Sequence, residues 1–116
     1  MFRVLCCGGR DYANRAALFA ALDHLLANRL PDVVIIHGGA RGADSLAGEY
    51  AAERGLACEV YPADWAAHGR AAGPLRNARM ITEGKPDAVV VFPGGRGTAD
   101  MRGRAIAAGI PVRDVK

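Results

Sequence analysis

Hydrophobic positions follow two alternating patterns along the chain. Short apolar runs, rich in β-branched residues and bounded by Gly, Pro or Asp, predict strands over residues 2–7, 33–36, 57–61, 88–92 and 111–115. The intervening segments repeat apolar residues every three or four positions, which predicts helices over residues 15–28, 44–54, about 74–83 and about 98–108. The alternation therefore predicts an α/β class: a single three-layer Rossmann-like domain, residues 1–116, with a five-stranded mostly parallel sheet.

Local signals refine this prediction. Asn14 is placed to cap the first helix, and a glycine follows each of the other three helices. The strands at 33–36 and 89–92 are apolar at every position, as expected for strands covered on both faces. Residues 62–73 form the one long irregular stretch, and loops of about this length are usually functional or locally folded.

Composition narrows the class of protein. The chain has 116 residues, and a hydrophobic fraction of 51% excludes a disordered tail. Its longest purely apolar run, residues 16–22, is far below the roughly 18 residues of a membrane helix, so no membrane partner is expected. Three cysteines form neither a disulfide framework nor a metal pattern, so we expect a cytoplasmic protein with no metal and no bound cofactor.

Glycine and arginine carry the functional signal. The 15 glycines are about twice the usual share, which is about 7% of a chain. The net charge is +3, and 13 of the 15 basic residues are arginine, whose planar guanidinium suits phosphate and carboxylate. A GC-rich genome would also favour arginine and alanine codons, so the arginine excess alone does not establish an anionic ligand.

Parallel α/β sheets bind ligands beyond the carboxyl ends of their strands, and the loops that follow the predicted strands are rich in glycine and charge. Glycine lets the backbone approach a ligand closely, and a helix N-terminus offers unpaired N–H groups to phosphate. The candidate ligand-binding residues in these loops are Gly8, Gly9, Arg10, Asp11, Gly38, Gly39, Arg41, Gly42, Asp44, Trp65, Gly94, Gly95, Arg96, Gly97 and Thr98.

Several of these candidates have a structural alternative. Thr98 could cap the last helix, and Asp11 and Asp44 could cap turns or helices. Trp65 could stack on a base or could plug the core. His37 ends a buried strand, and a histidine at such a position is more often hydrogen-bonded in the core than in contact with a ligand.

Four motifs in order carry a family resemblance: HGGARGAD at 37–44, PADW at 62–65 with His68 and Gly69, GPLRNARM at 73–80 and FPGGRGTADM at 92–101. Together they resemble the YspA-type, YpsA-related branch of the SLOG superfamily, also known as DUF2493, over nearly the whole chain. The resemblance implies a Rossmann-like fold, a nucleotide-derived ligand and a homo-oligomer. The chain also has a more distant resemblance to the Lonely Guy phosphoribohydrolases and to DprA.

The Lonely Guy motif PGGxGTxxE is matched at Pro93, Gly94, Gly95, Gly97 and Thr98, but Met101 stands where the catalytic Glu belongs. The arginine of their RxxxM stretch is matched by Arg76, which the resemblance adds to the ligand-binding residues. A thioether cannot transfer a proton. The resemblance therefore carries over phosphate binding more firmly than hydrolysis.

Three functions follow as hypotheses. The first is binding of a nucleoside monophosphate, ADP-ribose or an NAD derivative, by a sensor or ligand-processing protein. The alternative is an N-glycoside hydrolase or nucleotidase that uses Asp64 or His68 as its catalytic group. The third, by analogy with DprA, is single-stranded nucleic-acid binding, which usually needs several stacking aromatics, whereas this chain has three Phe, three Tyr and one Trp.

Overall fold

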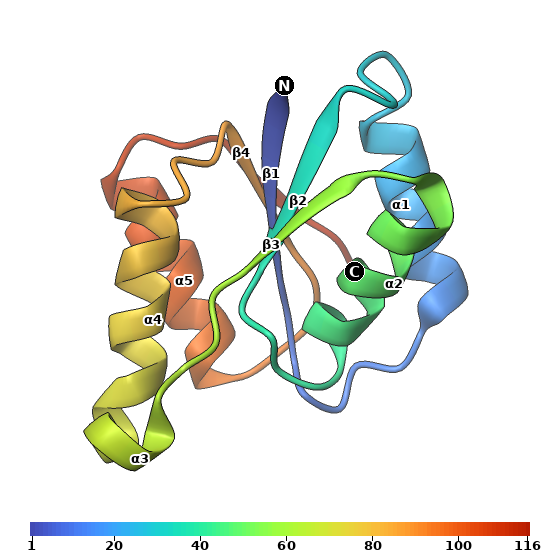
Figure 1. The fold of residues 1–116 in the computed structure, drawn as a ribbon. Helices are drawn as coiled ribbons and strands as arrows, with labels where there is room; N and C mark the ends of the chain where they lie inside the picture. Colours follow the sequence, from blue (N-terminus) through green and yellow to red (C-terminus); the bar gives the residue numbers. More distant parts are fainter.

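A computed structural model describes all 116 residues and confirms the predicted α/β class. Its five strands are β1 (Phe2–Cys7), β2 (Val33–His37), β3 (Ala57–Val60), β4 (Ala88–Val91) and β5 (Val112–Asp114). They form one sheet in the order β3-β2-β1-β4-β5, and every neighbouring pair is parallel. The carboxyl ends of all the strands therefore lie on one edge of the sheet, the lower edge in Figure 1.

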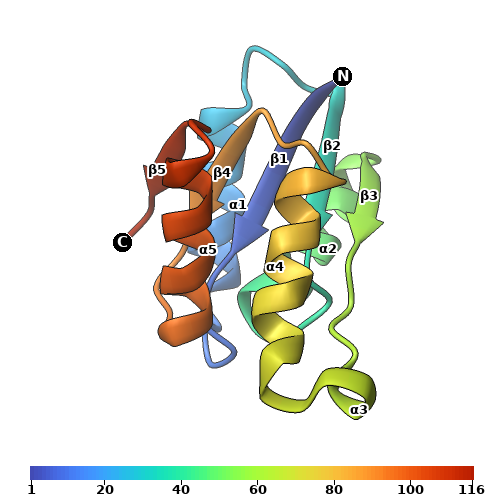
Figure 2. The same cartoon turned by 90° about the vertical axis from the view of Figure 1, so that its left-hand side faces the viewer.

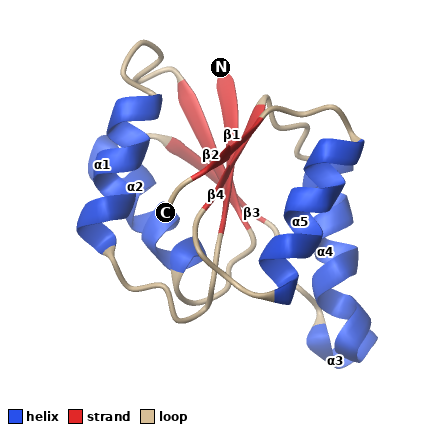
Figure 3. Ribbon diagram, turned by 180° about the vertical axis from the view of Figure 1, so that it is seen from behind, coloured by secondary structure: helices blue, strands red, loops and turns tan.

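The helices are α1 (Arg15–Leu25), α2 (Ala43–Arg54), α3 (Trp65–His68), α4 (Ala72–Thr82) and α5 (Arg96–Ala107). Helices α1 and α2 form a layer on one face of the sheet, and helices α4 and α5 form a layer on the other face (Figure 1, and from behind in Figure 3). Figure 2 shows α4 and α5 side by side in front of the sheet, with the short α3 below α4. None of the helices combines the length and the apolar character that spanning a membrane requires.

Each face of the sheet has its own apolar core, because successive strand residues point to opposite faces. In β1, Val4 and Cys6 pack with α1 and α2, whereas Leu5 and Cys7 pack with α4 and α5. This arrangement explains why the central strands are apolar at every position.

The structure corrects several predicted boundaries. Asn14 does cap α1, with its side chain accepting from the Ala17 N–H at 3.1 Å, but the helix ends at Leu25, three residues early. The stretch 62–73 is not irregular, because it holds α3, a 3-10 turn at Gly69–Ala71 and the start of α4. That turn runs directly into α4, so α4 begins two residues before the predicted Pro74.

Candidate functional site

Three loops meet at the carboxyl edge of the sheet, and Gly9 joins them. The Gly9 N–H donates to the Pro93 carbonyl at 2.8 Å, and the Gly9 carbonyl accepts from the Ala43 N–H at 3.1 Å. The loops that follow β1, β2 and β4 are therefore tied together through main-chain hydrogen bonds.

Some glycines at this edge are needed for the loops to pack against one another. A Cβ on Gly42 would collide with the Gly9 carbonyl, and Gly42 also has a φ of 79°, which favours glycine. A Cβ on Gly94 would collide with the Thr98 hydroxyl and the Gly9 N–H. Gly42 and Gly94 were expected to contact the ligand, but in the structure Gly42 packs against Gly9 and Arg10, and Gly94 packs against Gly9 and Thr98.

Two adjoining cavities open at this edge. The larger has a volume of about 590 Å³, and the smaller has a volume of about 490 Å³. Of the predicted binding residues, the larger is lined by Gly8, Gly9, Arg10, Asp44, Trp65, Arg76, Gly95, Arg96, Gly97 and Thr98. The smaller is lined by Arg10, Gly38, Gly39, Arg41, Trp65 and Arg76. Neither cavity is lined by Asp11, Gly42, Asp64, His68 or Gly94.

The glycine-rich loop after β2 is closed by a buried carboxylate. Asp44, in the first turn of α2, is 7% exposed, and its Oδ2 accepts from the Gly38 N–H at 3.1 Å and the Ala40 N–H at 3.2 Å. Burial raises the pKa of the Asp44 carboxyl, whereas these two hydrogen bonds and the charge of Arg76 oppose that rise. Asp44 therefore occupies the loop N–H groups that a phosphate would otherwise use.

His37 completes this closure. Its Nδ1 accepts from the Gly39 N–H at 3.0 Å, and the side chain is buried at the end of β2. Burial lowers the pKa of His37, although the negative charge of Asp44 opposes the effect. His37 is thus the hydrogen-bonded core histidine that its position predicted.

The glycine-rich loop after β4 is open. Gly95 is the N-cap of α5, no side chain caps the helix, and its first turn has no acidic residue. The N–H groups of Arg96, Gly97 and Thr98 make no hydrogen bond, because the first N–H groups of a helix have no acceptor within the helix itself. A Cβ on Gly95 or Gly97 would meet nothing within 4 Å. Thr98 is therefore not the cap, because the chain enters the helix one turn earlier.

Arg76 of α4 lies between the two loops and is held in place. Its Nη1 donates to the Gly38 carbonyl at 2.6 Å, and its Nε donates to the Asn77 Oδ1 at 2.9 Å. Asn77, 4% exposed, donates in turn from Nδ2 to the Gly97 carbonyl at 3.2 Å and to the Asp100 Oδ2 at 3.0 Å. One buried amide therefore fixes Arg76 to the start of α5.

Sequence reasoning gave no role to Asn77 or Asp100. Asp100 lines the larger cavity, while Met101, which replaces the Lonely Guy glutamate, is buried and also borders it. Burial of the Asp100 carboxyl raises its pKa, but hydrogen bonds from Arg104 and Asn77 outweigh this and lower the pKa overall. The signal for Asn77 was available, because it is a polar residue beside Arg76 in a motif already singled out.

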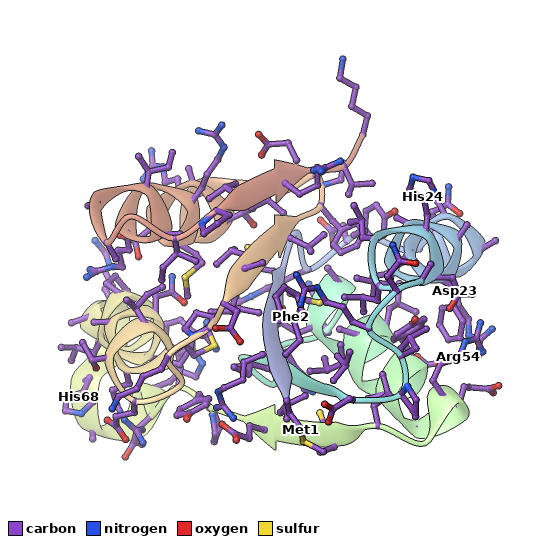
Figure 4. All side chains as sticks on the ribbon, turned by 90° about the horizontal axis from the view of Figure 1, so that it is seen from above. Met1, Phe2, Asp23, His24, Arg54 and His68 are labelled. Carbon is purple, nitrogen blue, oxygen red and sulfur yellow. The ribbon has the colours of Figure 1, made fainter.

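Arginines differ in their partners according to where they lie. Arg54, which lies outside both cavities, forms an ion pair with Asp23, with Nη2 2.7 Å from Oδ2. The two side chains lie beside each other, Asp23 on α1 and Arg54 on α2 (Figure 4). The arginines outside the cavities that form ion pairs are Arg3, Arg15, Arg54, Arg79, Arg102 and Arg104. The arginines that line the larger cavity, none of which forms an ion pair within 4.0 Å, are Arg10, Arg70, Arg76 and Arg96.

Neither of the two predicted catalytic residues lines either cavity. Asp64 caps α3, with its Oδ1 accepting from the Ala67 N–H at 3.0 Å. His68 lies on the outside of the molecule (Figure 4). Asp11 is fully exposed and pairs loosely with Arg41 at 3.8 Å. A catalytic role for Asp64 or His68 stays a prediction. Asp64 directly precedes Trp65, which lines both cavities, but neither Asp64 nor His68 lines either of them.

Other chemistry in the larger cavity is limited. Cys7 borders it, but burial and the negative charge of Asp44 raise the pKa of its thiol to about 12, so the thiol stays protonated at neutral pH. No three His, Cys, Asp or Glu side chains gather in an arrangement that could hold a metal ion. The arrangement is suited to holding an anion.

The fold and this edge define a class, the Rossmann-like α/β proteins. Within solved structures, the chain is similar to TM1055, an X-ray structure of the Northeast Structural Genomics Consortium, with a TM-score of 0.74 and 22% identity. That likeness covers 97% of this chain and 72% of TM1055, and it shows the shared fold.

The sequence comparisons go further. The family model of the YspA, cpYpsA-related SLOG family matches residues 2–68, and the Gene 61 protein of Mycobacterium phage D29 is 40% identical over 97% of this chain and 94% of its own length. The chain belongs to the YspA, cpYpsA-related SLOG family, which confirms the resemblance of its motifs. Membership of this family indicates the binding or processing of a nucleotide-related ligand.

Proposed function

We propose that the protein binds a nucleotide-derived phosphorylated ligand, with a phosphate at the start of α5. The observation that carries this proposal is a coincidence of position: the start of α5, which has no side-chain cap and no acidic residue in its first turn, borders the same cavity as the arginines that have no carboxylate partner. The larger cavity has four arginines and two aspartates, which leaves an excess of positive charge. An anion would supply the missing partner.

Gly95 and Gly97 support the same position for the phosphate. Neither has a positive φ, and a Cβ on either would meet no protein atom within 4 Å, so the fold does not require glycine there. A side chain at Gly97 would project beside the free N–H groups of the first turn. The absence of side chains at these two positions leaves room for a ligand to reach the backbone.

The rest of the ligand has space and a surface to contact. A volume of about 590 Å³ is within the usual range for small-molecule sites, about 300–1,000 Å³. Trp65 is 48% exposed and borders both cavities, so its indole offers a face for a base. Arg96 and Arg76 would neutralise the phosphate charge.

Calorimetric titration with AMP, adenosine and inorganic phosphate tests this proposal. We expect AMP to bind at least about tenfold more tightly than adenosine, because only AMP can use the start of α5. Gly97→Leu should weaken AMP binding by about tenfold or more by filling the space over the free N–H groups.

Gly103→Leu is the matched control. Gly103 lies in the same helix and also has open space at its Cβ position, but it borders neither cavity. Its substitution should leave AMP affinity unchanged within about twofold. Failure of AMP, ADP, ADP-ribose and NAD alike to bind the folded protein would overturn the proposal.

A further inference from the structure

The positive surface continues past the region that one phosphate at α5 would contact. Of these two cavities, Gly95, Arg96, Gly97 and Thr98 line the larger one alone, whereas Arg41 lines the smaller one alone. No carboxylate lines the smaller cavity. A ligand with one phosphate at α5 would leave this second positive region without an anion.

Arg10 and Arg76 lie where the two cavities meet, because each borders both of them. Arg76 is fixed by hydrogen bonds through Nη1 and Nε, so its Nη2 is left without a protein partner. Arg10 makes no hydrogen bond or ion pair, and its guanidinium lies over the Trp65 ring, 5.2 Å from the centroid. Both guanidinium groups therefore have donors available at the junction.

The two guanidinium groups also repel each other. Burial lowers the pKa of Arg76, and the positive charge of Arg10 lowers it further, while Asp44 is the carboxylate that opposes this. Asp44 is already engaged by the N–H groups of Gly38 and Ala40. An anion between Arg10 and Arg76 would replace this repulsion with two charge-assisted contacts.

We infer that the ligand carries two anionic groups, one at the start of α5 and a second held between Arg10 and Arg76 at the junction of the cavities. This inference rests on the proposed function. Its ligand class is a nucleotide with a second phosphate, either as a diphosphate or at a separate position of the ribose.

Trp65 is the only tryptophan in the chain, so its fluorescence reports directly on this junction. Titration with AMP, ADP, adenosine 3′,5′-bisphosphate and ADP-ribose, followed by calorimetry and by fluorescence, tests the inference. We expect at least one compound with two anionic groups to bind about tenfold more tightly than AMP and to shift Trp65 emission more than AMP does.

Arg10→Gln separates the two anion positions. It should weaken the binding of compounds with two anionic groups about tenfold more than it weakens the binding of AMP. Arg113→Gln is the control, because it removes the same charge from an exposed residue of β5 that borders neither cavity. Arg10 has no hydrogen bond to lose, so its substitution should not unfold the protein.

The outcomes distinguish this inference from the proposed function. Equal affinities for AMP and for every compound with two anionic groups would overturn the inference and leave the proposed function in place. Equal weakening of both classes by Arg10→Gln would also overturn it, since Arg10 would then contact the first phosphate. Absence of binding by all four compounds would overturn both.

Discussion

Two glycine-rich loops at the same edge of the sheet precede helices of the same length, yet they differ in what their N–H groups contact. The loop before α2 is closed by its own carboxylate, with Asp44 bonded to Gly38 and Ala40. The loop before α5 has no acidic residue in the helix's first turn, and its N–H groups are free. The helix position that holds Asp44 in α2, the second after the N-cap, holds Gly97 in α5.

The contrast shows that a glycine-rich loop before a helix is not sufficient for an anion site. Both loops have the backbone geometry and the helix dipole that favour an anion. In α2 the protein supplies that anion from its own chain, and in α5 it does not. The loop before α2 therefore has a carboxylate partner within the chain, and the loop before α5 is the candidate for phosphate binding.

Removing the carboxylate that closes the first loop should have the largest effect. Asp44→Ala leaves two loop N–H groups without an acceptor and leaves Arg76 without its opposing charge. Buried donors that lose their partners cost about 1–3 kcal/mol each, so we expect the free energy of unfolding to fall by about 3 kcal/mol. Urea denaturation followed by circular dichroism measures this change.

Ser45→Ala is the control in the same turn of α2. The Ser45 hydroxyl donates to the Ala40 carbonyl at 3.0 Å but is exposed, so its loss should cost less than about 1 kcal/mol. Similar losses in the two variants would mean that Asp44 does not hold the loop as described.

Adding a carboxylate to the open loop should have the next largest effect. Gly97→Asp places an acid in α5 at the position that Asp44 has in α2, where it would compete with a phosphate for the same helix start. We expect AMP affinity to fall by at least about tenfold, measured by calorimetry. The helix should gain up to about 1 kcal/mol from the charge at its N-terminus.

Gly97→Asn separates charge from size, because the two side chains have nearly the same shape. The Asn variant should retain more affinity for AMP than the Asp variant does. If AMP binds Gly97→Asp as tightly as it binds the wild-type protein, the phosphate does not lie at the start of α5.

The fold could be predicted because its signals are local and repeated. The apolar runs of β2 and β4, the cap at Asn14 and the glycines after the helices each depend on neighbouring residues. The path of residues 62–73 could not be predicted, because α3 is only four residues long and begins with the exposed Trp65. No periodic pattern is readable over one helical turn.

The site could be predicted only in part. Sequence reasoning located the edge where the cavities open and the loop before α5, but it did not distinguish the loop before α2, which its own carboxylate closes. The difference depends on where the Asp44 side chain points, which the sequence does not specify, since a first-turn aspartate can also face solvent. The role of Asn77 likewise depends on three contacts from α4 to other parts of the chain, which no local pattern reports.

The smallest expected effect is a pH dependence confined to the closed loop. Burial lowers the pKa of His37 below its usual value of 6.5, so the unfolded chain takes up a proton first as the pH falls. The stability that neutral His37 provides is therefore fully present above about pH 6.5 and is lost as the pH falls below it. His37→Asn keeps an acceptor near the Nδ1 position for the Gly39 N–H but cannot titrate, so its free energy of unfolding should fall less between pH 7 and pH 5.5. Identical slopes for His37→Asn and wild type would show that His37 is not held neutral by the closed loop.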